Sequence, residues 1–387
     1  MEKPTSITNT VTNTVTNTVM NTVNLAKTKI NNMDDNFVIF MITLIMAIII
    51  IIVIIYKLYI NNLQSSEEKY MNNLYSEPNK YINSIDKTYT NRFGDYYINT
   101  AYNACSGGNY KNDFVSLDVL KAIIKQGVRG LDFAIYNESD TPVIATSTSE
   151  SSYVKETYNS IRFVDLIDTI NNYAFSDTAP NKTDPIILHL RIKSNNKLLY
   201  DNMATIFGKY SNKILGNSDS FADRGENFGI TPLSKLIGKI VIVVDGLNKT
   251  YEESPKFLEY VNLVSNSNYM WSFKFFDILN TYEPEELTNH NKSNMTIVLP
   301  NLGNNPDNPS ALLSRQYGCQ MVAMRYQTID SYLLENIKFF DENKHAFVLK
   351  PEELRAPNNV ISNPTPQKPE NSYKTRTYTN NLINFKY

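Results

Sequence analysis

The chain has 387 residues, with 37 Lys and Arg against 39 Asp and Glu, and it is long enough for one large domain with additional segments. This near balance of charge argues against a nucleic-acid partner, because a protein that binds nucleic acid carries a basic excess. Two cysteines, Cys105 and Cys319, are too few for the disulfide framework of a small secreted protein and favour a reducing compartment for the folded part.

Residues 1–36 contain a four-residue repeat, NTVTNTVTNTVMNTV. The repeat carries no charge, few large apolar groups and many β-branched residues, which disfavour a helix. We expect a disordered N-terminal tail, with a stalk or a partner-binding tail as the alternative.

The next segment, Phe37–Tyr56, is an uncharged apolar run, FVIFMITLIMAIIIIIVIIY. At 1.5 Å per residue, a helix of about 20 residues spans roughly 30 Å, which is the hydrocarbon thickness of a bilayer. A cleaved signal peptide would have a shorter apolar core and a small-residue cleavage site. The run predicts a single-pass membrane protein whose partner is the lipid bilayer. Lysines on both sides, at Lys27, Lys29, Lys57 and Lys69, leave the side of the membrane undetermined.

Residues 57–90 are polar and are expected to form a spacer, and residues 356–387 are rich in Pro, Asn and Lys and are expected to form a disordered tail. Between them, over residues 91–355, short apolar runs alternate with helical patterns, one of which begins at Ser116 and stops at Gly127. The other helical patterns are FVDLIDTINNYAF and KLLYDNMATIFGKY, and the expected strands are VRGLDFAIY, PVIAT, PIILHLRI, KIVIVVDG, MWSFKFF, MTIVLP, CQMVAMRYQ and HAFVLKP.

Repeated strand–helix units over this length predict an α/β domain with a parallel sheet, either a (β/α)8 TIM-like barrel or a variant of it. An open doubly wound sheet is the alternative. No Gly-rich phosphate loop opens any of the helices, which weakens that alternative.

Several of these runs resemble a known family. GDYYINTAYN, GVRGLDFAIYN, PVIATS, FVDLIDTINNYAF and PIILHLRI resemble the X region of eukaryotic phosphoinositide-specific phospholipases C. PLSKLIGKIVIVV and GCQMVAMRYQTID, followed by FFDENKHAFVLKPEELR, are similar to its Y region. The resemblance implies a distorted TIM barrel of the phospholipase C phosphodiesterase type and calcium-dependent cleavage of inositol phospholipids. It places the X half at about 93–216 and the Y half at about 231–355, with 217–230 as a short connection.

The family uses two catalytic histidines, and the resemblance puts them at Tyr102 and Thr146. Neither residue can replace histidine as a proton carrier, because the pKa of tyrosine is about 10 and threonine does not titrate in the useful range. His290, placed in a polar loop, and His345, at the start of the last strand, are interpreted as structural or solvated. His189 shares a strand face with Arg191 and is interpreted as an interior histidine, with a relocated catalytic base as the alternative.

The calcium ligands of the family are implied to fall on Asn103, Gly130, Asp132 and Arg191. The formal charge of this set is zero instead of minus three, and calcium affinity follows the charge of its oxygen ligands. We expect no metal and no cofactor here, and we expect Asp132 to pair with Arg191.

The phosphate-binding lysines of the family are implied to fall near Val243 and Asp245, and the segment NMTIVLPNLGNNPDNPS contains no arginine. An acidic residue at such a place repels an inositol phosphate. The predicted set for phosphate binding is therefore also degenerate.

Three functions remain open at this point. The first is a membrane-anchored pseudoenzyme whose barrel binds a protein or lipid partner or serves as a structural module. The second is an active phosphoric diester hydrolase, acting in lipid metabolism or signalling through the non-standard residues His189, Cys105, Asp132 and Arg191. The third is an architectural surface protein, which would fit a viral source.

Overall fold

The computed structural model describes residues 16–25, 27–28, 35–149, 153–357 and 374–387. Within them, eight parallel strands follow one another around a nearly closed barrel in the order β7-β6-β5-β2-β1-β10-β9-β8. The two end strands approach each other, where an isolated bridge joins Ser267 and Met270, but no ladder closes the sheet. This confirms the predicted α/β barrel. The strands are β1 (Tyr96–Ala101), β2 (Gly130–Glu138), β5 (Ile186–Lys193), β6 (Ile240–Asp245), β7 (Leu263–Ser265), β8 (Met270–Lys274), β9 (Met295–Leu299) and β10 (Met321–Met324).

Three further strands lie outside the parallel path. β3 (Thr141–Ile144) pairs antiparallel with β2 and with β4 (Ile161–Arg162), so the run PVIAT forms a hairpin outside the barrel. β11 (Phe347–Leu349) pairs antiparallel with the beginning of β1. Both runs were predicted as strands, and the structure adds that neither belongs to the parallel set.

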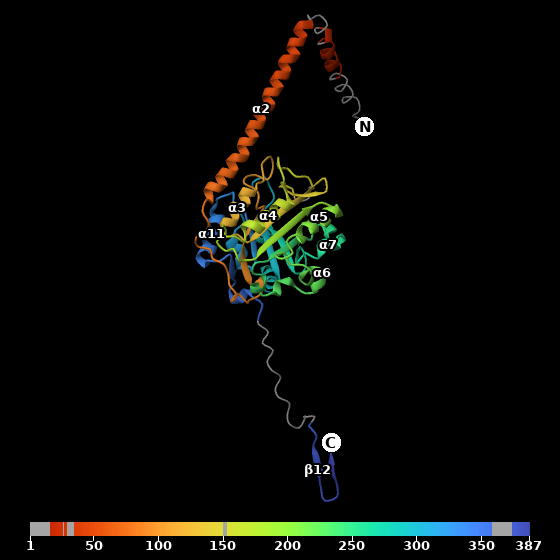
Figure 1. Cartoon of the computed structure of the whole chain (residues 1–387), viewed down its shortest axis with the longest axis vertical. Helices are drawn as coiled ribbons and strands as arrows, with labels where there is room; N and C mark the ends of the chain where they lie inside the picture. Colours follow the sequence, from red (N-terminus) through yellow and green to blue (C-terminus); the bar gives the residue numbers. More distant parts are fainter. Residues whose placement is uncertain (1–15, 26, 29–34, 150–152, 358–373) are drawn as a thin grey trace, which may run out of the picture.

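Helices follow most of the parallel strands and cover the outside of the barrel (Figure 1). The side chain of Ser116 accepts a hydrogen bond from the backbone of Asp118 and caps the first of these helices, as its sequence predicts. At the other end of that helix the chain turns at Gly127 with φ +76°, where an added Cβ would meet Ile82 at 2.8 Å. The helices of the described barrel are α3 (Leu117–Lys125), α4 (Phe163–Tyr173), α5 (Lys197–Gly208), α6 (Phe221–Arg224), α7 (Pro255–Leu258), α8 (Phe275–Leu279), α9 (Pro284–Ser293), α10 (Ala311–Gln316) and α11 (Ser331–Asn343).

The barrel interior is apolar at its lower end, where the strands begin, and polar at its upper end, where the carboxyl ends of the strands lie. Alternate residues of each strand face inwards, and the lower layers are filled by side chains such as Ile98, Ile187, Val241, Met295 and Met321, all buried. The outward residues pack beneath the helices in a second, larger cluster. Charged residues inside the barrel therefore collect towards its upper end.

The first 18 residues of the expected spacer over residues 57–90 are helical. Helix α2 (Asp35–Leu74) continues through the apolar run and on for another 18 residues, as the single long helix of Figure 1. The segment contains no Gly or Pro until Pro78, so nothing in the sequence ends the helix earlier. Met71 and Tyr75 are buried against the outer side of the barrel, and the Tyr75 hydroxyl donates to the carbonyl of Tyr326 at 2.7 Å.

Both tails also differ from expectation where they are described. Residues 16–25 of the N-terminal tail are helical, and the Thr22 hydroxyl donates to the carbonyl of Thr18 one turn earlier at 2.7 Å. At the other end, β12 (Thr377–Thr379) and β13 (Asn384–Lys386) form an antiparallel hairpin. The remainder of the two predicted disordered tails, residues 1–15, 26, 29–34 and 358–373, lies outside the described residues.

Candidate functional site

The candidate site lies at the carboxyl end of the barrel, where parallel strands present their last side chains to one shared space. Tyr102 and Asn103 directly follow β1, and Asp132 lies on β2. His189 and Arg191 lie on β5, two residues apart and on the same face. β6, β7 and β8 end at Asp245, Ser265 and Lys274, respectively.

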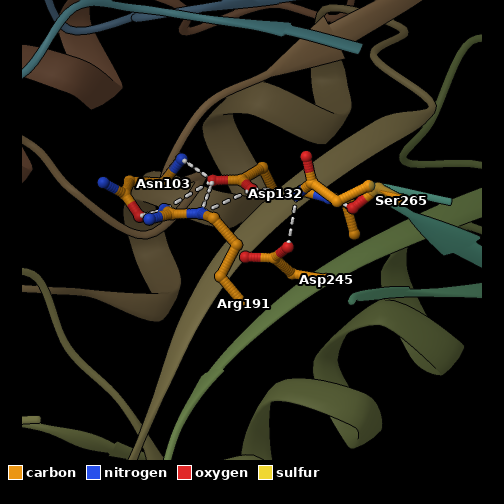
Figure 2. Close-up of polar contacts among 7 residues, drawn as sticks. Asn103, Asp132, Arg191, Asp245 and Ser265 are labelled. Atoms are coloured by element: carbon orange, nitrogen blue, oxygen red, sulfur yellow. Dashed lines mark hydrogen bonds and ion pairs between the residues drawn. The ribbon is translucent and has the colours of Figure 1, made fainter. Parts of the chain in front are cut away.

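Arg191 joins Asn103 and Asp132 (Figure 2). One terminal nitrogen of the guanidinium donates to Oδ1 of Asn103 at 2.6 Å and to Oδ1 of Asp132 at 2.8 Å. The Nε of Arg191 donates to Oδ2 of Asp132 at 3.0 Å, which makes the ion pair bidentate. Asp132 is 0% exposed and Arg191 is 4% exposed, so the pair is isolated from solvent.

Asp132 is held as a carboxylate although it is buried. Burial favours the neutral acid, but the Arg191 guanidinium and then the hydrogen bond with His189 outweigh it and hold the pKa of Asp132 well below its usual range. Nδ1 of His189 lies 2.7 Å from Oδ2 of Asp132, and because an ionised carboxylate can only accept, Nδ1 carries the proton.

The other ring nitrogen of His189 lies 2.9 Å from the hydroxyl of Ser265. Asp132, His189 and Ser265 therefore form the sequence of contacts found in a Ser–His–Asp catalytic triad. All three side chains are 0% exposed, and Asp132 is shared with Arg191, so in this structure no substrate atom can reach the serine. The arrangement fixes the interior histidine, which is the structural interpretation given to His189.

Tyr102 covers the ion pair. Its ring lies 4.7 Å from the guanidinium carbon of Arg191 and 5.9 Å from the amino group of Lys274, and it packs edge-on against Tyr110 at 5.6 Å. Tyr102, at the first implied histidine position, therefore packs on Arg191, which lies at an implied metal-ligand position.

The residue at the second implied histidine position is buried and contacts a neighbouring loop. Thr146 is 1% exposed, and its hydroxyl donates to the carbonyl of Tyr110 at 2.9 Å. Cys105 is also buried, and burial raises the pKa of its thiol, which keeps it protonated and unreactive.

Gly130 shares a face of β2 with Asp132 but lies one layer lower than the other implied metal-site residues. In the strand register, Asp132 is level with His189 and Ala134 is level with Arg191, whereas Gly130 is level with Ile187, lower in the barrel. A Cβ added at Gly130 would lie 2.4 Å from Oγ1 of Thr100 and 2.9 Å from its Cβ. The space beside Gly130 is therefore filled by a rigid β-branched side chain.

Neither of the two implied phosphate-binding positions carries a cationic side chain. Val243 is buried in the interior, and Asp245 accepts hydrogen bonds from the side chain of Asn266 at 2.7 Å and from the backbone of Leu247 at 3.2 Å. Figure 2 places Asp245 on the strand beside Arg191. The carboxylate is thus used to hold the turn after β7.

Sequence reasoning missed Arg325, which directly follows β10. Its guanidinium donates to Oδ1 of Asn305 at 2.6 Å and to the Tyr110 hydroxyl at 2.8 Å, and it also contacts the carbonyl of Pro306. The segment at residues 294–310 contains no arginine of its own. It is contacted instead by the guanidinium of Arg325 from the end of the neighbouring strand β10. The signal was the arginine in CQMVAMRYQ, but it is fully buried and bonded to protein groups, as a structural residue would be.

The two remaining histidines lie away from the site. His290 lies on helix α9, not in the predicted polar loop, and stacks on Trp271 with ring centroids 3.6 Å apart. Burial lowers the pKa of His290. His345 precedes β11 and contacts the carbonyl of Asn83 at 3.1 Å. Both make contacts within the fold, and their interpretation as structural or solvated residues stays a prediction.

The donor set does not fit a calcium ion. In the part of the chain that the structure describes, no group of three or more His, Cys, Asp or Glu side chains is placed to hold a metal. The amide oxygen of Asn103 and the carboxylate of Asp132 both accept from Arg191, and the formal charge of the three side chains is zero. A cation would have to displace a bidentate guanidinium.

The comparisons with known proteins agree with the barrel. The chain matches the model of the phosphatidylinositol-specific phospholipase C X domain over residues 89–245 and that of the Y domain over residues 249–353. The X match includes β6, which the sequence analysis assigned to the Y half. No curated protein matches the chain by sequence.

Two solved structures share the fold. The crystal structure of PLC21 from L. pealei superposes on 70% of the chain with a TM-score of 0.56 and 18% sequence identity, and that of PLC21 from S. officinalis on 70% with 0.53 and 17%. The chain spans 39% and 38% of the lengths of these two proteins. With both domain matches covering the strands of the barrel, the chain belongs to the phosphatidylinositol-specific phospholipase C family.

Proposed function

We propose that this protein is a membrane-anchored, catalytically inactive member of its family, in which the barrel serves as a binding or structural module. The observation that carries the proposal is the position of Arg191. Its guanidinium lies between Asn103 and Asp132 and takes the oxygen atoms that a divalent cation would need.

The groups needed for proton transfer support the same proposal. Tyr102 packs on Arg191, and Thr146 donates its hydroxyl hydrogen to a backbone carbonyl. An active enzyme acting through the alternative set would need a substrate to reach His189, Asp132 or Cys105, and each of these is buried. The family's phosphodiesterase chemistry therefore has no accessible acid, base or nucleophile among these residues.

A helix that could cross a membrane supports the anchor. The apolar part of α2 is exposed along its length, as a lipid-facing helix would be, and the helix is long enough to span the hydrocarbon region. Tyr158, in the loop between β3 and β4 at the barrel's upper end, lies near Tyr56 at the end of the apolar run. In this proposal the upper end of the barrel faces the bilayer.

The activity test uses the full chain in nanodiscs that contain phosphatidylinositol, with and without millimolar calcium. We expect no release of inositol phosphate above the rate of empty discs and no calcium-dependent rise in melting temperature, because a ligand that does not bind the folded state cannot stabilise it. An active calcium-dependent phospholipase C in the same discs is the positive control. Hydrolysis above background, or a gain of several degrees with calcium, would overturn the proposal of an inactive barrel.

The anchor is tested separately by carbonate extraction of the full chain from membranes. We expect the protein in the membrane pellet, and we expect a variant with Ile48→Arg and Ile52→Arg to be extracted, because two charges near the helix centre oppose insertion. The matched control carries arginines at two exposed positions of α11, Leu334→Arg and Tyr332→Arg, and should remain in the pellet. Complete extraction of the unaltered chain would contradict the anchor.

A further inference from the structure

The C-terminal hairpin is a small unit built by its own sequence, TYTNNLINFKY. Beyond its two strands, Arg376 and Tyr387 exchange backbone hydrogen bonds at 2.7 and 2.9 Å, and the amide of Asn380 donates to the carbonyl of Ile383 at 2.9 Å. The side chain of Asn380 accepts from the amides of Leu382 and Ile383 at 2.9 and 2.8 Å and so fixes the turn.

The hairpin has two chemically different faces. Side chains alternate along a strand, so the cross-strand pairs Tyr378–Phe385 and Arg376–Tyr387 share one face with Ile383. The rings on this face contact each other, with centroids 5.9 Å apart for Tyr378 and Phe385 and 5.6 Å apart for Phe385 and Tyr387. The opposite face is polar and carries Thr377, Thr379, Asn384 and Lys386.

The aromatic face is open to solvent. Tyr378 is 51% exposed, Phe385 is 49% exposed, and Leu382 at the turn is 92% exposed. A two-stranded hairpin is marginally stable at best in water unless its apolar face is covered. Tyr378, Ile383, Phe385 and Tyr387 alternate with polar residues along the strands. We therefore expect another molecule to cover the aromatic face.

The charge around this face narrows the choice of occupant. Residues 374–387 carry Lys374, Arg376 and Lys386 and no Asp or Glu. A second copy of the hairpin would bring like charges together, and the face of two short strands offers much less than the roughly 800 Å² per partner of a specific protein interface. Binding to a lipid surface has no such minimum contact area, and the boundary of a bilayer accommodates aromatic rings beside cationic side chains.

We propose that the hairpin at residues 374–387 is a second membrane-binding element, which lays its aromatic face on the polar–apolar boundary of a bilayer that contains anionic lipid. Tyr378, Phe385 and Tyr387 enter the boundary, and the cationic side chains meet the lipid phosphates. The 16 residues at 358–373 connect the hairpin to the barrel and can extend at most about 55 Å, which limits where it can bind. This element does not depend on whether the barrel is catalytically active.

The test places an environment-sensitive fluorophore on the full chain through Asn381→Cys, beside the exposed Leu382. Cys105 and Cys319 are buried and do not compete for the label. The labelled chain is compared in nanodiscs of phosphatidylcholine alone and in discs with one-third phosphatidylserine. We expect fluorescence to rise by about twofold or more, with a blue shift, only in the anionic discs, and to fall again at high salt. Co-elution of the chain with the discs is recorded in parallel, so a failed anchor is distinguished from a failed hairpin.

Variants separate the two parts of the interaction. Phe385→Ser with Tyr387→Ser should abolish the signal, and Arg376→Gln with Lys386→Gln should reduce it at least severalfold. The matched controls, Leu334→Ser and Lys338→Gln on the exposed surface of α11, should leave it unchanged. The proposal would be overturned by a signal that is the same in both lipids or by no signal at all. A rise that depends on protein concentration without lipid would also overturn it, in favour of a second copy of the chain.

Discussion

Two buried arginines lie at opposite ends of the barrel and are used in different ways. Arg191, near the carboxyl end of β5, is bonded directly to the carboxylate of Asp132. Arg129, just before β2 at the amino-terminal end, donates to the carbonyl of Ala174 at 2.9 Å and to Oδ1 of Asn181 at 2.7 Å. Its nearest carboxylate, Asp184, is one step removed and accepts from the side chain of Asn181 at 2.9 Å.

This difference in contact reverses the pKa shift of the two carboxyl groups. Arg191 lowers the pKa of Asp132 despite its burial, whereas burial raises the pKa of Asp184 to about 6 and the more distant Arg129 only partly opposes it. Two aspartates of similar burial are thus predicted to respond to pH in opposite directions. A direct guanidinium contact, and not burial itself, decides the sign.

Breaking the upper pair should have the largest effect. Arg191→Ala leaves Asp132 buried without its ionic partner, and we expect the free energy of unfolding to fall by about 3–5 kcal/mol in urea denaturation at neutral pH. The double variant Arg191→Met with Asp132→Asn removes both charges and should recover most of this loss. If the single and double variants are equally unstable, the ion pair does not determine the stability of the site.

Breaking the lower network should cost less. Arg129→Met removes hydrogen bonds to three buried acceptors, the carbonyls of Ala174 and Asn181 and the side chain of Asn181. We expect a loss of about 2–3 kcal/mol in the same assay, because Asp184 can take up a proton and so avoid an unpaired buried charge. A loss larger than that of Arg191→Ala would reverse the comparison.

The sequence predicted the barrel better than the site because strand and helix patterns are local. Apolar runs located β2, β5 and β6 and the helices between them. The three-residue strand β7 was missed, since three residues show no period. The continuation of α2 was not predicted because residues 57–90 were interpreted only as a polar spacer, although nothing before Pro78 ends a helix.

Within the site, the contact of Asp132 with Arg191 was expected because the resemblance implied that both positions are calcium ligands of the family, and it is present in the structure. Gly130, which the resemblance also implied, lies on the same face of β2 as Asp132 but one layer lower, where Thr100 fills the space beside it. The hydrogen bond of His189 to Ser265 and the packing of Arg325 on Tyr110 join residues far apart in the chain. No local pattern carries such information.

The opposite pKa shifts predict two separate pH ranges. Because the pKa of Asp132 is lowered on folding, its contribution to stability is complete above its unfolded pKa of about 3.8 and is lost as the pH falls below that value. Because the pKa of Asp184 is raised to about 6, stability should instead fall as the pH rises from about 3.8 to 6, by about 2 kcal/mol. Thermal unfolding measured across this range should show that slope, and Asp184→Asn should flatten it. A slope unchanged in the variant would assign it to other groups.

A third carboxyl group extends the comparison to a site with no arginine partner. Glu67, on the part of α2 that lies against the barrel, has its carboxylate over Gly108, where the carboxylate of Asp113 also lies. Burial and then the hydrogen bond with Asp113 raise the pKa of Glu67 to about 9. The protonated acid can donate to Asp113, and the charged form would repel it, so this contact should weaken as the pH rises from about 4.5 to 9.

Glu67→Gln tests this contact and should have the smallest effect of the series. The amide keeps the shape of the protonated acid and can donate to Asp113 at any pH, so we expect the variant to be more stable than the unaltered chain at pH 8 and equal to it at pH 4. Glu67 is only half-buried, and solvent screening limits the gain to about 1 kcal/mol, or about 2–4 °C in melting temperature. Glu68→Gln, one residue along the same helix, is the matched control and should show no such pH-dependent gain. Equal stability of the Glu67 variant and the unaltered chain at pH 8 would show that the two carboxyl groups do not share a proton across the contact between α2 and the barrel.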